Sequence, residues 1–185
     1  MKTIKKYIFP VLTLLPILVL FLTACSKDEK DGSEGSLDLG EGTLTVTGDV
    51  EGVFKGMADF EGKLASQTET WKISMHNYSP QTFSLTLLKM NDGIENPKPG
   101  TYTIGISTKA DFSAAFTHIV DEDYVNAIEY STFEDSNSRT LTIESVTEKT
   151  IKGKFEFTAH EYDDMLNPRG DVEIKGQFKA NKRKY

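Results

Sequence analysis

The chain has 185 residues, of which 28 are acidic and 21 basic, and its formal net charge is −7. An acidic chain with scattered lysines and no basic stripe is repelled by phosphate backbones, so we expect no nucleic-acid partner. The single cysteine, Cys25, excludes an internal disulfide.

Residues 1–24 have the layout of a cleaved signal peptide. A basic start with three lysines precedes an apolar stretch over residues 7–22, which Pro10 and Pro16 interrupt. A membrane-spanning helix requires about 20 apolar residues without such breaks, and this stretch is shorter. We therefore expect residues 1–24 to be removed. Without the three lysines, the remaining chain carries 18 basic and 28 acidic residues, a formal net charge of −10.

The apolar stretch ends in Leu22-Thr23-Ala24-Cys25, which resembles the lipobox of bacterial lipoproteins. The resemblance implies that a diacylglycerol thioether forms on Cys25, that a signal peptidase cuts before it, and that the new amino terminus is acylated. Two or three acyl chains hold a protein stably on a membrane, whereas one holds it only marginally. We therefore expect an outer-membrane lipoprotein of the cell envelope, which contacts the membrane through acyl chains on Cys25.

Residues 25–41 are expected to form a flexible acidic linker. They are mostly small or charged, so they cannot bury a core of their own. The acids that follow Cys25, namely Asp28, Glu29 and Asp31, resemble the export signal that sends lipoproteins of Bacteroidota-type bacteria to the cell surface. A solvated linker whose charges are not recognised by any export factor explains these acids equally well. The sequence therefore allows either location, the cell surface or the periplasmic face of the membrane.

Residues 42–185 are expected to form one β domain, because apolar residues recur there with period two. The apolar positions within 44–60 share one parity and are broken by glycines, which indicates one bent strand or two strands in sequence. The alternating run 71–75, the turn 77–80 and the run 83–87 predict a hairpin.

The middle of the domain has a less regular pattern. Residues 102–106 alternate, and the pattern then lapses, so residues 110–115 are expected to form a short helical turn or a loop. Strands are predicted over 116–120 and 124–133, on either side of an acidic turn, and over 141–146.

The last two predicted strands are the clearest. Residues 151–159 and 172–180 each contain Ile-Lys-Gly-x-Phe, with apolar side chains on one face. A glycine on a buried face leaves room for a phenylalanine ring on the neighbouring strand, so these two strands are predicted to be antiparallel partners.

Eight to ten short strands without a convincing helix predict an all-β fold, as a single antiparallel β-sandwich or barrel-like domain. Strand motifs such as Gly-Thr-Tyr-Thr-Ile at 100–104 and Val-Glu-Ile-Lys-Gly-Gln-Phe at 172–178 resemble those of uncharacterised β-rich lipoproteins of Bacteroidota. The resemblance implies a β-sandwich-like envelope lipoprotein and brings no activity or site residue with it.

Metal-binding and catalytic motifs are sparse. His160-Glu161 begins like a zinc protease motif, but Asp164 stands where the second histidine is required. Asp121 with Asp123, and Asp163 with Asp164, could supply oxygen ligands to calcium, although they lack the spacing of a known calcium loop. Solvated turns that discourage edge-strand aggregation explain these acids as well. No hydrolase elbow, phosphate loop or dinucleotide fingerprint occurs, so we expect neither a cofactor nor an enzymatic activity.

Aromatic residues in predicted loops are candidates for ligand display. Tyr78 and Tyr162 fall in such loops, whereas Trp71, Tyr102 and Phe155 share the parity of apolar strand residues and are expected in the core. The sequence thus predicts a non-enzymatic binding module for a glycan, a protein or a small molecule. The alternative is a lipocalin-like carrier of a small hydrophobic ligand. A packed interior favours the module, and a large apolar cavity favours the carrier.

Overall fold

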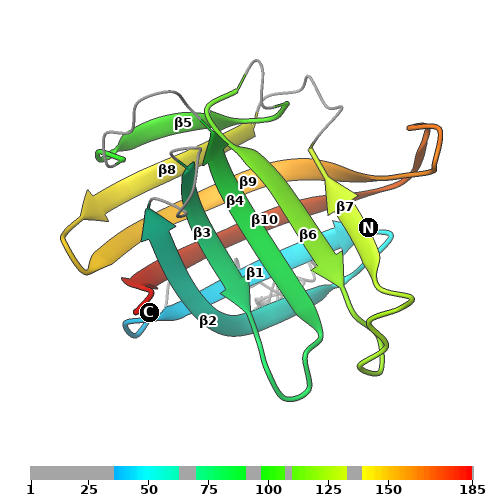
Figure 1. The fold of residues 1–185 in the computed structure, drawn as a ribbon, viewed down its shortest axis with the longest axis horizontal. Coiled ribbons are helices and arrows are strands. Elements are labelled where there is room, and N and C mark those ends of the chain that lie inside the picture. The colour runs from blue at the N-terminus through cyan, green and yellow to red at the C-terminus, as the bar shows by residue number, and fades with distance from the viewer. Residues whose placement is uncertain (1–35, 63–69, 91–96, 107–109, 133–138, 185) are drawn as a thin grey trace, which may run out of the picture. The chain divides into compact units, whose positions relative to one another are not determined.

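The described part of the chain consists of β-strands joined by turns and loops (Figure 1). The computed structural model describes residues 36–62, 70–90, 97–106, 110–132 and 139–184, which belong to one compact unit. The predicted leader, Cys25 and the linker up to residue 35 lie outside these ranges. Within the ranges, no helix is long and apolar enough to cross a membrane.

The described ranges contain ten strands, labelled as in Figure 1. In chain order they are β1 (Glu41–Gly48), β2 (Gly52–Gly62), β3 (Thr70–His76), β4 (Phe83–Met90), β5 (Gly100–Ile104), β6 (Ser113–His118), β7 (Ile128–Ser131), β8 (Arg139–Val146), β9 (Thr150–Tyr162) and β10 (Pro168–Lys182).

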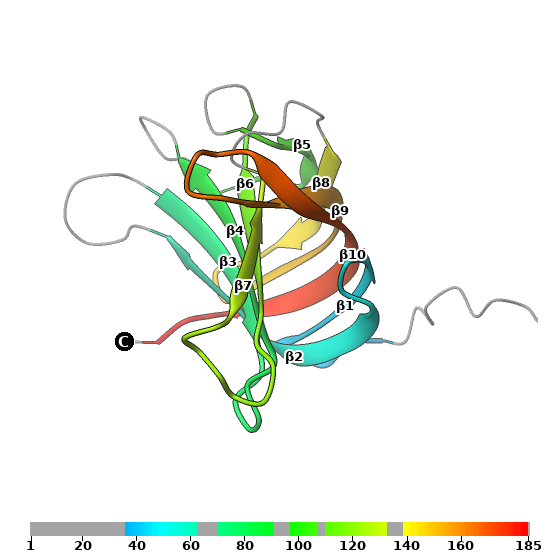
Figure 2. The same ribbon diagram turned by 90° about the vertical axis from the view of Figure 1, so that its right-hand side faces the viewer.

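Eight of these strands close into a barrel-like ring. β1, β2, β3, β4, β6, β7, β9 and β10 are antiparallel neighbours in that order, and β10 pairs with β1 to complete the ring. Figure 2 shows the two resulting walls, with β3, β4, β6 and β7 on one side and β1, β9 and β10 on the other. The predicted all-β, barrel-like domain is confirmed. Because every described strand and its partners lie within residues 41–182, the barrel is self-contained.

The wall between β6 and β9 is shared by three strands. β9 pairs with β8 over residues 151–156 and with β7 at His160, so both strands use the same edge of β9. β5 pairs with β8, and its last residue, Ile104, bridges to Phe112 beside the start of β6. This wall is thus built by β7 at one end and by β5 and β8 at the other.

Inward-facing side chains fill the barrel. Successive residues of a strand point to opposite faces, so the parity of the sequence decides which apolar side chains are buried. Burial contributes about 1.5–3 kcal/mol for each large apolar side chain. Trp71 and Phe155 are buried as predicted, whereas Tyr102 is only partly buried. The largest fully buried side chains are Tyr130, Phe83, Phe112, Phe116, Phe157, Phe178, Leu44, Ile73, Met75, Leu85, Leu87 and Ile104.

The β9–β10 hairpin confirms the pairing predicted from the repeated motif. Gly153 lies opposite Phe178, and Gly176 lies opposite Phe155. Each ring lies over the glycine that it faces. A Cβ atom on Gly176 would be 2.5 Å from Cζ of Phe155, and one on Gly153 would be 2.9 Å from Cζ of Phe178.

The run of apolar residues over 44–60 forms two strands. Gly48 ends β1 with a φ of +111°, a conformation that L side chains rarely adopt. A Cβ atom there would also lie 2.5 Å from the carbonyl oxygen of Asp171, so glycine is needed for the close approach of β1 to β10. The predicted hairpin formed by β3 and β4 is confirmed.

The prediction for residues 110–115 is wrong for residues 113–115. Residues 113–118 form β6, in place of the expected helical turn or loop. Phe112, Ala114 and Phe116 are buried at alternate positions, so the pattern of a strand is present. The pattern is weak in the sequence because alanine has a small side chain and is depleted in strands.

The strand predicted over 124–133 is also too long, because β7 covers only Ile128–Ser131 in the described ranges. The carboxylate of Asp123 accepts hydrogen bonds from the backbone amides of Val125 and Asn126, at 3.0 and 3.2 Å. These amides stabilise a turn and are therefore not available to a strand ladder.

Candidate functional site: the two ends of the barrel

One end of the barrel carries connections rich in acidic residues, which we call the acidic end. It comprises the β1–β2, β3–β4, β6–β7 and β9–β10 connections, residues 49–51, 77–82, 119–127 and 163–167. The strand directions bring all four to one end, on the right and at the bottom of Figure 1. Together they contain seven acidic residues and no lysine or arginine.

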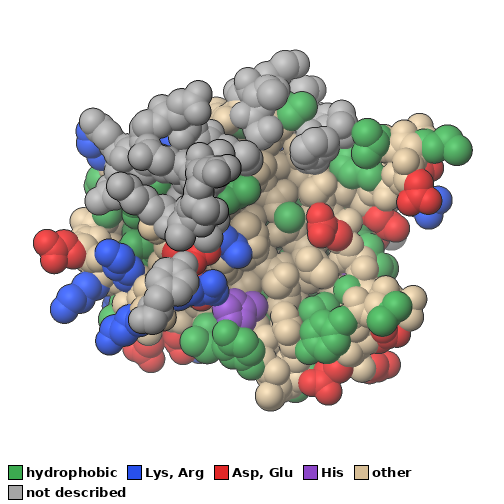
Figure 3. All heavy atoms as spheres, in the orientation of Figure 1, with side chains coloured by type: hydrophobic (Ala, Val, Ile, Leu, Met, Phe, Trp, Pro, Cys, Tyr) green, Lys and Arg blue, Asp and Glu red, His purple; other side chains and the backbone are tan. Residues whose placement is uncertain are grey.

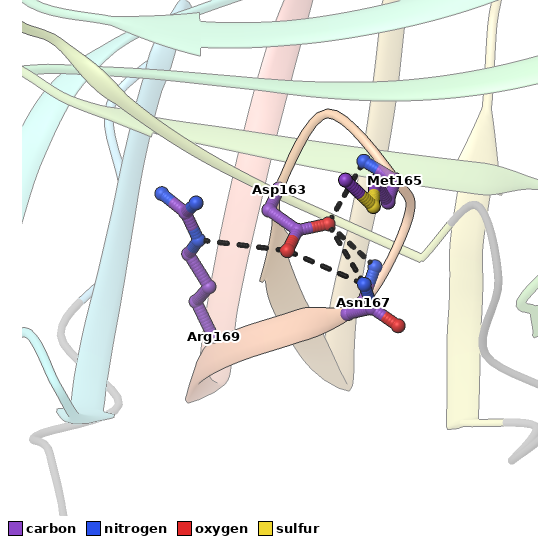
Figure 4. Close-up of polar contacts among 4 residues, drawn as sticks. All are labelled: Asp163, Met165, Asn167 and Arg169. Atoms are coloured by element: carbon purple, nitrogen blue, oxygen red, sulfur yellow. Dashed lines mark hydrogen bonds and ion pairs between the residues drawn. The ribbon is translucent and has the colours of Figure 1, made fainter.

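The β9–β10 connection is held by the carboxylate of Asp163 (Figure 4). Oδ1 accepts hydrogen bonds from the backbone amides of Met165 and Asn167, both at 2.9 Å. The side-chain amide of Asn167 donates to the same carboxylate at 3.3 Å, and Arg169 Nε lies 3.9 Å from Oδ2. The backbone hydrogen bond from Asn167 is the largest cause that lowers the pKa of Asp163 below its ordinary value.

The β6–β7 connection uses the same device. Besides the backbone amides of Val125 and Asn126, the carboxylate of Asp123 accepts a hydrogen bond of 2.6 Å from the side-chain amide of Asn126. This side-chain hydrogen bond is the largest cause that lowers the pKa of Asp123. Both connections are thus ordered by an aspartate that binds its own loop, as in an Asx turn.

The two ordered connections display large apolar side chains. Val125 is 92% exposed and Tyr124 58%, and at the tip of the other hairpin Met165 is 84% and Leu166 56% exposed. Leu166 has a φ of +62°, in the left-handed region that non-glycine residues seldom occupy. Residues held in such conformations cluster at functional sites.

The aspartates proposed as calcium ligands are placed in these same turns. Asp123 and Asp163 already accept hydrogen bonds from their own loops, while Asp121 and Asp164 are exposed. Among the described residues, no group of three or more His, Cys, Asp or Glu side chains could hold a metal ion. Hydrogen bonding within each turn therefore explains the order of these connections without an ion.

The two tyrosines proposed for ligand display differ in position. Tyr78 lies in the β3–β4 connection and is 63% exposed, with its ring 4.5 Å from the ring of His76. Tyr162 is the last residue of β9 and is half-buried, with its ring 6.0 Å from that of His160. The expected loop position is therefore correct for Tyr78 and wrong for Tyr162.

A pocket of about 940 Å³ lies at the opposite end of the barrel, and we call it the basic pocket. It is bounded by the chain before β1, the end of β2, the start of β3, the β8–β9 connection and the end of β10. Phe60 and Trp71 close its inner side with stacked rings, whose centroids are 5.6 Å apart and whose planes differ by 11°. Leu39, which is 53% exposed, and the partly buried Val146 add apolar surface.

Arg183 fixes one side of the basic pocket. Its backbone amide donates to the carbonyl oxygen of Phe60 at 2.9 Å, which continues the short parallel pairing of β10 with β2. Its Nη2 lies 3.0 Å from Oδ2 of Asp59, and its Nη1 lies 3.7 Å from Oε2 of the buried Glu61. The chain beyond β10 is thus attached to β2 rather than free.

Three further cations surround the basic pocket. Lys149, Lys182 and Lys184 all line it and are all exposed, and Glu148 is the single acidic residue among its described lining residues. In Figure 3, Lys and Arg side chains gather on the left, whereas acidic and hydrophobic side chains predominate on the right. Among the described residues, the lining of the basic pocket is therefore mainly positive, in contrast to the acidic end.

No family model matches the chain, and no curated protein and no solved structure is significantly similar to it. Membership of a lipoprotein family accordingly stays a prediction. Sequence reasoning missed the basic pocket, because residues far apart in the chain build it. The turns formed by the Asp-Asn pairs in the two hairpin connections could be predicted from the local sequence, since aspartate and asparagine favour turns at such spacings.

Proposed function

We propose that this protein is a lipid-anchored envelope protein whose barrel binds a second protein through the acidic end. The observation that carries the proposal is the exposure of Val125 and Met165 on turns that aspartate carboxylates hold in place. Large apolar side chains exposed on ordered loops at one end of a fold are candidates for an interaction surface. Ordered loops also lower the entropic cost of binding.

The charge of the acidic end indicates the chemistry of the partner. Seven acids without a lysine or arginine favour a partner surface that combines basic and apolar residues. Acyl chains on Cys25 and the linker that precedes β1 would keep the barrel at the membrane while leaving this end accessible. The role requires no catalytic group, in line with the expected absence of enzymatic activity.

The alternative role, a carrier with its ligand inside the barrel, has less support. The interior positions are occupied by large side chains, among them Phe83, Phe116, Phe157, Phe178 and Tyr130, with exposed fractions of 2% or less. A lipocalin-like ligand would need this space. The packing of the interior therefore favours the binding module.

Photocrosslinking in intact cells tests the proposed interaction. A photoreactive residue in place of Val125 or Met165 is expected to give the same discrete crosslinked product from both positions. The matched control replaces Lys154, which is exposed on the side of β9 away from both ends. Crosslinks of equal yield from position 154, or none from 125 and 165, would contradict the proposal.

The charge of the partner is tested with the same crosslinkers. Asp164→Lys reverses an exposed acid within the acidic end, and Glu173→Lys reverses an exposed acid on the outer face of β10. We expect Asp164→Lys to lower the yield of the crosslinked product several-fold and Glu173→Lys to leave it unchanged. Equal effects of the two variants would argue against recognition by charge.

A further inference from the structure

The basic pocket combines features that the proposed function does not use. Its volume of about 940 Å³ lies within the range of small-molecule sites, roughly 300–1,000 Å³. It lies at the other end of the barrel from the acidic end, so a ligand bound in it would not compete with the partner. Ligand binding in the basic pocket is therefore independent of the proposed function.

The charge of the pocket selects an anion. Lys149, Lys182 and Lys184 are exposed at its rim, and none of them forms an ion pair with another described residue. Arg183 is already engaged by Asp59 and Glu61, which leaves the three lysines to attract a negative group. Three lysines around one concave site in an acidic chain focus the local potential on anions.

The inner side of the pocket selects an apolar group. The stacked rings of Phe60 and Trp71 are buried, whereas the three lysines are exposed, so the rings lie at the back of the pocket and the charges at its rim. Leu39 and Val146 add further apolar lining. The indole Nε1–H of Trp71 is buried and has no hydrogen-bond acceptor among the described residues. Gly62, which also lines the pocket, adjoins this edge, because a Cβ atom on it would lie 3.5 Å from Nε1.

We propose that the basic pocket binds a small amphipathic anion, a carboxylate that carries an apolar chain or ring. The apolar part packs against Leu39, Val146 and the Phe60–Trp71 pair, and the carboxylate lies among the three lysines. Binding of both parts requires a ligand that is charged at one end and apolar at the other. A neutral analogue or a cation with the same apolar chain satisfies only half of the site.

Trp71 is the only tryptophan of the chain, so its fluorescence reports on this pocket directly. The protein for the measurement is residues 26–185, which retains the whole self-contained barrel. Decanoate below its micelle concentration is the probe, with decanol and decyltrimethylammonium as the neutral and cationic analogues. We expect decanoate to change the Trp71 emission saturably and to bind at least about tenfold more tightly than either analogue, a difference of about 1.4 kcal/mol.

Paired variants locate the site. Lys149→Gln with Lys182→Gln removes two charges from the rim, and Lys154→Gln with Lys175→Gln removes two from the outer faces of β9 and β10. We expect the rim pair to weaken decanoate binding about tenfold or more and the control pair to leave it within twofold. Circular dichroism checks that both variants fold.

Three results would overturn the proposal. The first is equal binding of decanoate and decanol, and the second is equal weakening by the two pairs of lysine variants. The third is decanoate binding seen by calorimetry without a change in Trp71 emission, which would place the site elsewhere. None of them affects the photocrosslinking test of the acidic end.

Discussion

Gly153 and Gly176 make room on the buried faces of β9 and β10 for the rings of Phe178 and Phe155. The space is tight on several sides, because a Cβ atom on Gly176 would also lie 2.7 Å from the carbonyl oxygen of Thr43 on β1. Backbone atoms of a neighbouring strand cannot move away as a flexible side chain can. The two glycines are thus part of the core packing.

Substitution of Gly176 tests this packing. Gly176→Ala is expected to lower the free energy of unfolding by about 1–3 kcal/mol, the usual cost of overpacking a core. Gly100→Ala is the control, since a Cβ atom there meets nothing within 4 Å. Chemical denaturation measures both, and an equal effect of the two variants would show that the ring over Gly176 is not constrained.

His76 should make stability depend on pH. Burial is the main cause that lowers its pKa below the ordinary value of about 6.5, and Arg183 and Lys72 add to the shift while Asp59 opposes it. A lowered pKa means that the unfolded chain binds the proton more readily than the folded one. The contribution of neutral His76 to the stability of the folded state is therefore complete above about pH 6.5. It is lost as the pH falls through the folded pKa.

Thermal unfolding from pH 8 to pH 5 checks the role of His76. The melting temperature of the wild-type chain is expected to fall more steeply below pH 6.5 than that of His76→Gln, which has no titrating group at this position. Parallel pH profiles of the two proteins would be inconsistent with the assigned shift. The comparison at pH 8 gives the reference, because the imidazole is neutral there in both the folded and the unfolded state.

Predictions at the residue level succeeded where one face of a strand is buried. Leu44, Ile73 and Phe157 lie on the predicted inward parity and are fully buried. The prediction for Tyr162 failed because β9 extends to this residue, beyond the last apolar position at Ala159. A half-buried strand end carries no hydrophobic alternation that would distinguish it from a loop.

At the level of elements, the β9–β10 hairpin depends on its own turn. The carboxylate of Asp163 binds two backbone amides and the side chain of Asn167 across the tip. The lowered pKa of Asp163 means that this contribution to stability is present above the ordinary pKa of aspartate. It is lost as the pH falls through the folded pKa, since protonation removes the charge that the donors stabilise.

Hydrogen exchange tests the role of this carboxylate. Asp163→Ala is expected to accelerate exchange of the Met165 and Asn167 amides, because both lose their acceptor, while leaving the amides in the middle of β9 protected. Asp164→Ala is the control, as its side chain is exposed and forms no described hydrogen bond or ion pair. Equal exchange in the two variants would refute the role given to Asp163.

Hairpins between consecutive strands could be predicted from the sequence, because their turns and alternation are local. The β3–β4 and β9–β10 pairs are examples. The bounds of β7 could not, because its four residues form too short an alternating pattern to separate the strand from the turn before it. The Asp123–Asn126 pair is typical of a turn, and a turn at this pair predicts a start of the strand closer to Ile128.

At the level of the whole molecule, closure of the barrel determines both candidate surfaces. The ring closes through β10, which pairs with β1 and β9 and, at Asn181 and Lys182, in parallel with β2. Pairings between residues more than 100 positions apart leave no local signal in one sequence. The basic pocket at this junction could therefore not be predicted, although its lysines were visible.

The contrast in charge between the acidic end and the basic pocket follows from the same closure. Acidic turns at one end and the lysines of the β8–β9 connection and the chain terminus at the other are dispersed along the sequence. The fold gathers each set. The chain enters the barrel at the basic end, because Leu39 lines the pocket just before β1 begins. If Cys25 is lipidated, the tether thus reaches the barrel at the end opposite the proposed partner surface.

Lipidation of Cys25 decides whether the barrel works as a tethered binding protein. Labelling of this residue is therefore the measurement to make first. Cells that express the full chain are labelled with a radioactive fatty acid, and intact cells are then treated with protease. We predict a labelled protein that partitions with the envelope, and no label in Cys25→Ala. Cleavage on intact cells places the acidic end outside the cell, and protection until the outer membrane is opened places it in the periplasm. An unlabelled wild-type protein, or equal labelling of Cys25→Ala, would contradict the lipid anchor and with it the proposed function.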